Sequence, residues 1–372
     1  YTGKDMWSRK LGALSASTPA VGGETVYATV LSRSPGMEAG RVVALNTVNG
    51  HIRWSRDLPS RAESSPLLDD GKIFFGSQNG TVYALAARTG KVLWTYHAKG
   101  AVKASPSLSN GVLYFGDYSG ELQAVRERDG HRVWASGSGG ALLGSGTFYS
   151  TPAVMYGRVF LGNTDGRVYA YDASSGKLDW AVQTGAYVYA SPAVTNAPGL
   201  GPTIYEGSYD GTFYALNARS GRVEWRYKAG GKISGSATII GNIVYFADLG
   251  THRTIGLGIS TGRVVFTKDT GSFDPVVSDD HYLYLSGITG LYALAPDAPT
   301  THPAAAAKAA QAAMRRRAAR AAARRRAAQV AARKRTAQTA RRRAAVSARR
   351  RRLARERARE RSARRHARHR GH

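Results

Sequence analysis

The chain has 372 residues, of which 42% are hydrophobic, and it contains no cysteine. Without a thiol it forms neither a disulfide framework nor a thiolate metal site. The formal net charge is +28, but residues 301–372 hold 26 of the 53 Lys and Arg residues and two of the 25 Asp and Glu residues. The first 300 residues are therefore nearly neutral, which excludes a basic character for the body of the protein.

No run of about 18 apolar residues occurs, so the sequence predicts no membrane-spanning helix. The chain begins at Tyr1 rather than methionine and shows no signal segment. We therefore expect a processed or truncated chain, from which any export signal would have been lost with the start.

Tryptophan marks an internal repeat along the first 270 residues. The six tryptophans are spaced 47, 40, 40, 46 and 45 residues apart, and a phenylalanine follows 41 residues later in the same local sequence. Because a fixed period of this length is typical of repeat architectures, the spacing is the first guide to the fold. These anchor residues are Trp7, Trp54, Trp94, Trp134, Trp180, Trp225 and Phe266.

Each repeat contains the same succession of short apolar segments and turns. In the second repeat, SSPLL (64–68) precedes an alternating run, KIFFGS (72–77), and then an Asn-Gly turn. A third run, TVYALA (81–86), leads through a Thr-Gly turn to the tryptophan segment, KVLW (91–94). Runs rich in Val, Ile, Tyr and Phe, broken by Asn-Gly or Asp-Gly, predict antiparallel strands joined by tight hairpins. Four strands in 40–47 residues make one blade, so the sequence predicts an all-β propeller.

The blade count depends on how the two ends of the repeat region are read. The last three-strand set lacks a tryptophan strand, and TGKDMW (2–7) is predicted to supply it and so close the ring. Thr2-Gly3-Lys4 also resembles the turn after a third strand, so an eight-bladed parent stays open as an alternative to seven blades. Three-strand sets occur at residues 17–46, 64–86, 104–126, 150–172, 190–217, 234–259 and 273–295.

The tryptophan segments resemble the docking motif of PQQ-like propellers, a family that includes quinoprotein dehydrogenases and BamB-like proteins. The resemblance covers about residues 1–298 and is carried by TGKVLW (89–94), SGKLDW (175–180), SGRVEW (220–225) and TGRVVF (261–266). It implies that each anchor aromatic packs between adjacent blades.

The resemblance also raises the question of a cofactor. In the quinoprotein enzymes it implies PQQ on the propeller axis, next to an adjacent-cysteine disulfide and over a tryptophan, with a calcium ion and a catalytic aspartate. This chain has no cysteine, and all six of its tryptophans occupy docking positions. We therefore predict no cofactor, no metal and no catalytic residues, with a PQQ-dependent dehydrogenase as the alternative.

Five residues that precede first strands are candidates for contacts at the central channel. They lie at the ends of connections such as ASGSGGALLGSGTFY (135–149), and tyrosine, which is common at protein interfaces, predominates among them. We expect a monomeric cell-envelope scaffold that binds a protein there; alternatives are ordinary rim aromatics, or a sensor or ligand-binding domain of a larger envelope protein. The candidates are Lys103, Phe148, Tyr149, Tyr187 and Tyr189.

The region 299–372 is predicted to be a proline linker followed by an Ala/Arg-rich tail. It has no apolar stripe for docking, so we expect a mobile, partly helical appendage. Its charge predicts salt-sensitive binding to a polyanion such as nucleic acid, an anionic membrane or a cell-wall polymer, the alternative being a passive tail. The absence of aromatic residues excludes stacking on bases. The clustered arginines are Arg315, Arg316, Arg317, Arg324, Arg325, Arg326, Arg341, Arg342, Arg343, Arg349, Arg350, Arg351 and Arg352.

Overall fold

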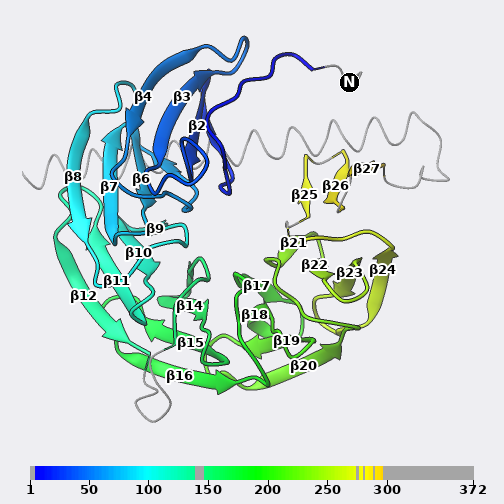
Figure 1. Cartoon of the computed structure of the whole chain (residues 1–372). Helices are drawn as coiled ribbons and strands as arrows, with labels where there is room; N and C mark the ends of the chain where they lie inside the picture. Colours follow the sequence, from blue (N-terminus) through cyan, green and yellow to red (C-terminus); the bar gives the residue numbers. More distant parts are fainter. Residues whose placement is uncertain (1–4, 139–145, 274–275, 280, 288–289, 296–372) are drawn as a thin grey trace, which may run out of the picture. The chain divides into compact units, whose positions relative to one another are not determined.

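A computed structural model describes residues 5–138, 146–273, 276–279, 281–287 and 290–295 (Figure 1). The chain divides into two compact units, Tyr1–Pro296 and Asp297–His372. The described residues all lie in the first unit, whose regular elements are strands, so the all-β prediction is confirmed. The predicted tail lies outside the described residues. In the part of the chain that is described, there is no helix long and apolar enough to cross a membrane.

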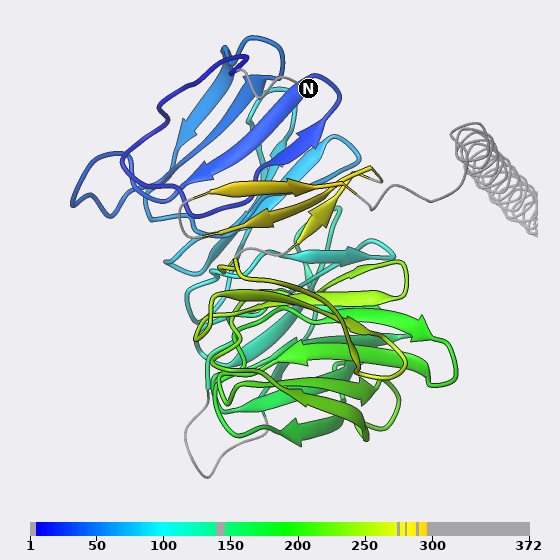
Figure 2. The same cartoon turned by 90° about the vertical axis from the view of Figure 1, so that its right-hand side faces the viewer.

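The strands form a β-propeller of seven antiparallel sheets, numbered here blades 1 to 7 in chain order. In Figure 1 the blades follow one another around a centre, with the first strand of each blade inside and the fourth outside. Each sheet is twisted, which is clearest in the turned view of Figure 2. Blade 1 is β1 (Ala20–Gly22), β2 (Thr25–Val30), β3 (Arg41–Asn46) and β4 (Ile52–Asp57); blade 2 is β5 (Leu67–Asp69), β6 (Lys72–Gly76), β7 (Thr81–Ala86) and β8 (Val92–His97); blade 3 is β9 (Ser107–Ser109), β10 (Val112–Gly116), β11 (Glu121–Arg126) and β12 (Arg132–Gly137).

The remaining blades repeat this meander, and the seventh has three strands among the described residues. Blade 4 is β13 (Ala153–Met155), β14 (Arg158–Gly162), β15 (Arg167–Asp172) and β16 (Leu178–Gln183); blade 5 is β17 (Ala193–Ala197), β18 (Gly201–Gly207), β19 (Thr212–Asn217) and β20 (Val223–Lys228); blade 6 is β21 (Thr238–Ile240), β22 (Ile243–Asp248), β23 (Arg253–Gly258) and β24 (Val264–Lys268); blade 7 is β25 (Val277–Ser278), β26 (Leu283–Ser286) and β27 (Leu291–Leu294).

Glycine permits the tight connections inside a blade. Between β5 and β6, Asp70 and Gly71 have φ angles of 41° and 72°, the pair of positive values that a type I′ hairpin requires. At the other end of β6, Gly80 has a φ of 82° in the predicted Asn-Gly turn. An L-residue with a side chain adopts such angles only at a cost, which explains the glycines between the strands.

The core lies between the blades rather than within a single sheet. β7 is buried along nearly its whole length, because blades 1 and 3 cover its two faces, whereas the outer strand β8 alternates between half-buried and exposed residues. Val42 and Ala44 of blade 1 pack in one cluster with Ile73 and Phe75 of blade 2. Each blade therefore needs its neighbours in order to bury its apolar side chains.

Each tryptophan docks on the turn between the third and fourth strands of the next blade. The indole of Trp54, for example, donates its N–H to the Ala87 carbonyl oxygen over 2.8 Å and covers Gly90. A Cβ placed on Gly90 would lie 2.5 Å from Trp54 Cε3, so only glycine leaves room for the ring. The six indole N–H groups, of Trp7, Trp54, Trp94, Trp134, Trp180 and Trp225, donate respectively to the backbone oxygens of Thr47, Ala87, Glu127, Ala173, Ala218 and Ile259.

The two ends of the propeller differ from the predicted closure. The segment 2–7 was expected to form the fourth strand of the last blade, but its described part, Asp5–Trp7, belongs to no strand. Trp7 nevertheless donates to the Thr47 oxygen and covers Gly50 of blade 1, like the other indoles. Its docking therefore depends on the side chain and needs no strand pairing behind it. Phe266, which has no N–H, lies 5.6 Å from the Tyr245 ring and packs with blade 7.

Candidate functional site: the mouth of the central channel

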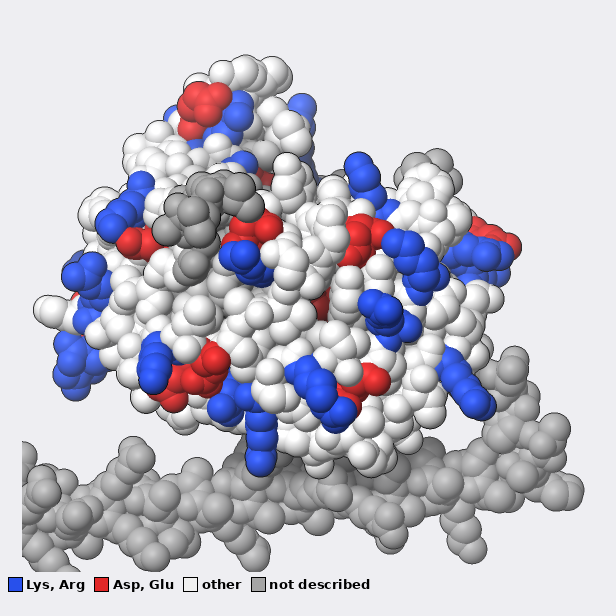
Figure 3. Space-filling view, turned by 90° about the horizontal axis from the view of Figure 1, so that it is seen from below, with Lys and Arg blue, Asp and Glu red and all other residues white. Residues whose placement is uncertain are grey.

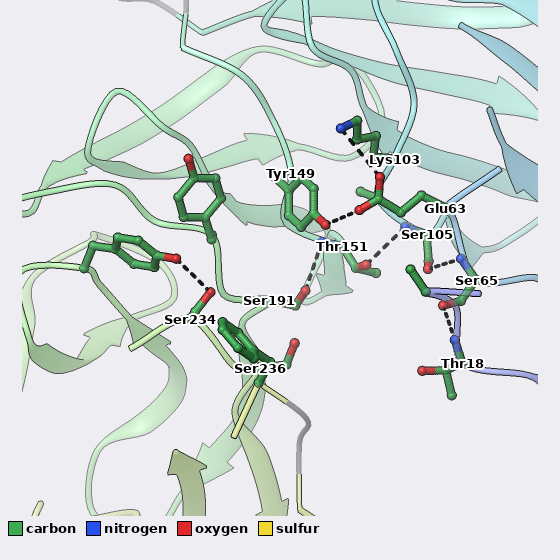
Figure 4. A pocket seen from close by; sticks show the side chains of 15 residues that line it. Thr18, Glu63, Ser65, Lys103, Ser105, Tyr149, Thr151, Ser191, Ser234 and Ser236 are labelled. Atoms are coloured by element: carbon green, nitrogen blue, oxygen red, sulfur yellow. Dashed lines mark hydrogen bonds and ion pairs between the residues drawn. The ribbon is translucent and has the colours of Figure 1, made fainter. Parts of the chain in front are cut away.

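A cavity of about 490 Å³ opens at the centre of the ring (Figure 4). Its walls come mainly from the short segments that precede the first strand of successive blades. Two positions of each segment, two residues apart, face the cavity, as expected for an extended chain. The position directly before the first-strand proline, or its equivalent, forms a hydroxyl ring: Thr18, Ser65, Ser105, Thr151, Ser191 and Ser236. The position two residues earlier forms a variable ring: Ala16, Glu63, Lys103, Tyr149, Tyr189 and Ser234.

The hydroxyl ring joins five blades by hydrogen bonds. The backbone N–H of Thr18 donates to Ser65 Oγ over 2.9 Å, and the N–H of Ser65 donates to Ser105 Oγ over 3.1 Å. Ser105 donates in the same way to Thr151 Oγ1, and Thr151 to Ser191 Oγ. Four of the six hydroxyls therefore satisfy a backbone group of the preceding blade, which fixes the positions of these side chains around the axis.

Five tyrosines form a continuous tyrosine arc along one side of the mouth, made of Tyr118, Tyr149, Tyr189, Tyr209 and Tyr187. The ring centroids of Tyr118 and Tyr149 are 6.1 Å apart, those of Tyr149 and Tyr189 are 5.7 Å apart, and those of Tyr189 and Tyr209 are 4.9 Å apart. Tyr187 continues the arc, 5.8 Å from Tyr189. Neighbouring rings are tilted or edge-on to each other, the arrangement that aromatic pairs prefer.

Glu63 is the carboxylate of the cavity wall; Tyr149 and Lys103 contact it within the wall, and Gln78 Nε2 donates to its Oε2 over 3.3 Å. The phenol of Tyr149 donates to Glu63 Oε1 over 2.6 Å, and Lys103 Nζ lies 3.5 Å from Glu63 Oε2 (Figure 4). Burial, followed by the hydrogen bond to Glu63, raises the pKa of Tyr149 above its ordinary value. Burial and the charge of Glu63 also raise the pKa of Tyr118. Both phenols therefore stay protonated at neutral pH and act as neutral groups.

Two lysines lie against rings of the tyrosine arc. Lys103 Nζ lies 4.8 Å from the centroid of the Tyr118 ring, and Lys232 Nζ lies 5.4 Å from that of Tyr209. These distances fall within the range of cation–π attraction. On the outer side of the propeller seen in Figure 3, basic and acidic side chains are interspersed among the described residues rather than collected into a patch of one sign.

The structure places three of the five predicted contact residues in the cavity wall. Lys103, Tyr149 and Tyr189 belong to the variable ring, while Tyr187 is 53% exposed beside it and belongs to the tyrosine arc. The prediction for Phe148 is wrong, because this ring is fully buried between blades 3 and 4.

The repeat explains the burial of Phe148. The corresponding residue of other blades is also apolar and buried: Val102, Val188 and Ile233. Each of these side chains covers a glycine at the end of a second strand, and Phe148 covers Gly116. Adjacent residues of an extended segment point to opposite sides, so Tyr149 faces the channel and Phe148 faces the core.

Several wall residues were not predicted as contacts. Glu63 and the hydroxyl ring were missed, although a Ser or Thr before each first-strand position recurs in six repeats and is visible in the sequence. Tyr118 and Tyr209 lie in the turns between second and third strands, and nothing in the local sequence shows that these turns meet the variable ring. The central part of the long connection, residues 139–145, lies outside the described residues.

The described wall of the cavity holds neither the ligand cluster nor the indole floor that the resemblance implies for calcium and PQQ. Among the described residues, no three His, Cys, Asp or Glu side chains are grouped as metal ligands. Every tryptophan is held at a blade interface with its N–H bonded, so no indole forms a floor for a planar cofactor. The wall offers hydroxyls, phenols and one lysine-paired carboxylate, which are groups for recognition by hydrogen bonding and ring contact.

Comparison with solved structures gives two matches with TM-scores above 0.5, which show the same fold. The crystal structure of BamB from Moraxella catarrhalis matches with a TM-score of 0.59 and 20% identity, over 75% of this chain and 81% of that one. A computationally designed protein, Ika8, matches with a TM-score of 0.56 and 14% identity, over 76% of this chain and 98% of that one. A quinohemoprotein alcohol dehydrogenase from Comamonas testosteroni matches with a TM-score of 0.47 and 18% identity, over 56% and 42% of the two chains.

No curated protein sequence matches the chain. A family profile does, in three overlapping stretches, residues 1–141, 119–248 and 197–365, which together span the tryptophan repeats. With the blades and their docked indoles described above, the chain belongs to the family described as Outer membrane protein assembly factor BamB.

Proposed function

We propose that this protein is a non-enzymatic scaffold that binds a protein partner at the mouth of its central channel. The observation that carries the proposal is the composition of the mouth, where a tyrosine arc on one side adjoins a ring of serine and threonine hydroxyls. Tyrosine supplies a large, rigid and amphipathic contact area, and small hydroxyl residues supply adaptable hydrogen bonds, which is also the composition of antibody binding loops. Membership of a propeller family that includes an assembly factor supports the same role.

A PQQ-dependent dehydrogenase is the alternative, and the donor set of the cavity argues against it. Titration of the purified protein with PQQ and calcium, followed by an alcohol-oxidation assay with a dye acceptor, tests this alternative. We expect no turnover, and steady turnover would overturn the scaffold proposal.

Site-specific photo-crosslinking tests the partner surface. A benzophenone amino acid placed at Tyr187, which is 53% exposed on the mouth, is expected to crosslink one discrete protein in cells of the source organism. Tyr156 is the matched control, because it is 39% exposed in the turn between β13 and β14, at the opposite end of the strands. Crosslinking to the same proteins from both positions, or from neither, would contradict a specific surface at the mouth.

We further propose that the protein acts outside the cytoplasm, in the cell envelope, as a monomer. The name of its family, an outer-membrane assembly factor, supports this location. Fractionation of cells that express the full-length gene is expected to place the protein outside the cytoplasm. Recovery in the cytosolic fraction would overturn the proposed location.

The basic tail is proposed to anchor the scaffold to an anionic polymer or surface. Its 26 Lys and Arg residues against two acids support binding by counterion release, without sequence readout. The nearly neutral propeller then keeps its own face free for the partner.

A further inference from the structure

We propose that the channel cavity binds a neutral, hydroxyl-rich ligand, a saccharide unit. This inference deepens the recognition role proposed for the mouth and rests on it, and it agrees with a ligand-binding function for the domain. It is carried by the unused hydrogen-bonding capacity of the cavity floor, the single carboxylate in the wall and the faces of the tyrosines.

The hydroxyl ring, called the floor of the cavity here, has hydrogen-bonding groups without a partner among the described residues. Ser65, Ser105, Thr151 and Ser191 each accept one backbone N–H from the preceding blade. A hydroxyl has one O–H donor and two acceptor lone pairs, so each of these groups keeps a donor and a lone pair. Within the described residues no protein acceptor takes these four O–H groups. A ligand hydroxyl, which also donates and accepts, matches this floor.

The charge of the wall selects against other ligand classes. Glu63 lies in the wall with its side chain 17% exposed, so a carboxylate or phosphate ligand would meet an anion there. Lys103 already supplies a cation, 3.5 Å from Glu63 and 4.8 Å from the Tyr118 centroid, so a ligand cation would meet a like charge. An apolar ligand would strip water from the floor hydroxyls without replacing their hydrogen bonds. A neutral polyol accepts from the floor, donates to Glu63 and meets none of these penalties.

Tyr149, Tyr189 and Tyr209 give the wall its shape and its apolar contacts. Their rings join edge to face, with centroid separations of 5.7 and 4.9 Å, into one curved surface. A pyranose ring has C–H faces and an equator of hydroxyls, and it therefore needs both an apolar wall and a polar floor. The cavity volume of about 490 Å³ lies within the range of small-molecule sites.

The test is direct binding of sugars to the full-chain protein. Cellobiose, maltose, trehalose and N,N′-diacetylchitobiose would be titrated by calorimetry and by ligand-observed saturation-transfer NMR, and dextran would represent a polymer. Malonate and choline serve as the anionic and cationic probes. Saturable binding of at least one saccharide, without binding of malonate or choline, is the expected result, and the disaccharide and dextran arms separate a free sugar from a polymer chain.

Variants locate the binding to the cavity. Tyr189→Ala removes a ring of the wall. Ser236→Ala removes a floor hydroxyl that, among the described residues, takes no part in the hydrogen bonds between blades. Each is expected to weaken saccharide binding by about tenfold, equivalent to one lost contact, whereas Tyr156→Ala at the opposite end of the strands leaves it unchanged. Ser236→Ala tests the floor even where Tyr189→Ala disturbs the arc.

Two results would overturn the inference. One is the absence of saturable binding by every saccharide at millimolar concentration, and the other is binding of malonate or choline in their place. Neither result removes the proposed protein partner, whose test is the crosslinking at Tyr187. Absence of a discrete crosslink from Tyr187, together with saturable sugar binding, would instead contradict only the proposal of a protein partner.

Discussion

Glu206 on β18 places a carboxyl group at a blade interface. The corresponding positions in blades 2, 3 and 4 are Phe75, Phe115 and Leu161, all fully buried. Glu206 is equally buried, and its Oε1 accepts only the N–H of Gly207, over 3.2 Å, while Oε2 has no partner within the described residues. Burial therefore raises the pKa of Glu206 well above its ordinary value of 4.5 and favours the protonated acid in the folded state.

The raised pKa of Glu206 gives stability a definite pH dependence. The unfolded chain releases the Glu206 proton near pH 4.5, whereas the folded chain holds it, so the contribution of this residue is most favourable below pH 4.5. It falls as the pH rises towards the pKa of the folded state. Glu206→Gln should flatten this part of the curve, and Glu206→Leu should stabilise the protein at neutral pH. Urea unfolding of the three proteins at about pH 4 and about pH 7 measures both effects; an unchanged difference between the two pH values in Glu206→Gln would contradict the assignment.

At the scale of the element, the interface between blades is a tryptophan held over a glycine turn. Gly130, with a φ of 72°, lies under Trp94, and a Cβ there would be 2.7 Å from Trp94 Cε3. Gly111 has nearly the same φ, 75°, but no atom lies within 4 Å of its ideal Cβ position. Alanine substitutions at these two glycines of blade 3 therefore distinguish two contributions to the loss of folding stability. One is the free-energy cost of a positive φ, and the other is the cost of displacing the indole.

Gly130→Ala and Gly111→Ala form a matched pair. Both variants impose a positive φ on alanine, which costs about 1–2 kcal/mol. Gly130→Ala also forces the indole aside, which adds about 1–3 kcal/mol. The unfolding free energy of each variant is measured by denaturant titration with tryptophan fluorescence as the signal. We expect Gly130→Ala to be less stable than Gly111→Ala. Equal losses in the two variants would mean that the indole adapts without cost.

Much of the element scale was predictable from the sequence because turns and strand alternation are local properties. The Asn-Gly and Asp-Gly turns and the tryptophan period determine strands, hairpins and blade order without further information. The channel-facing position of Tyr149 and the burial of Phe148 depend on a one-residue alternation. This alternation becomes visible only when repeats are aligned on the first-strand proline. The tyrosine arc is different, because Tyr118 meets Tyr149 across two blades, and such a contact depends on tertiary packing alone.

At the scale of the whole molecule, charge and fold are divided between two regions of the chain. The first 300 residues form the nearly neutral repeat region, and residues 301–372 hold a net charge of +24. Folding stability and attraction to polyanions therefore depend on different parts of the sequence.

Truncation after residue 298 tests this division. The shortened protein is expected to unfold at the same denaturant concentration as the full chain but to lose its affinity for a short DNA duplex of arbitrary sequence. Binding by the full chain should weaken by roughly a thousandfold or more between about 50 and about 200 mM salt, since several phosphate contacts release counterions. Fluorescence anisotropy measures the affinity, and duplex binding that survives truncation would place the anion site on the propeller.

Each indole docks on the following blade, and this arrangement also affects how the number of blades in such a propeller can change. Trp94 belongs to blade 2 and packs on Gly130 of blade 3, and Trp134 of blade 3 packs on Gly176 of blade 4. The segment from residue 95 to residue 134, called a cassette here, thus contains one turn that binds the indole of the preceding blade and one indole that binds the turn of the following blade. Excision of this cassette would join Trp94 to the segment that follows Trp134, and Trp94 would then pack on Gly176. Duplication or loss of a cassette therefore changes the number of blades, while every interface keeps a tryptophan packed on a glycine turn.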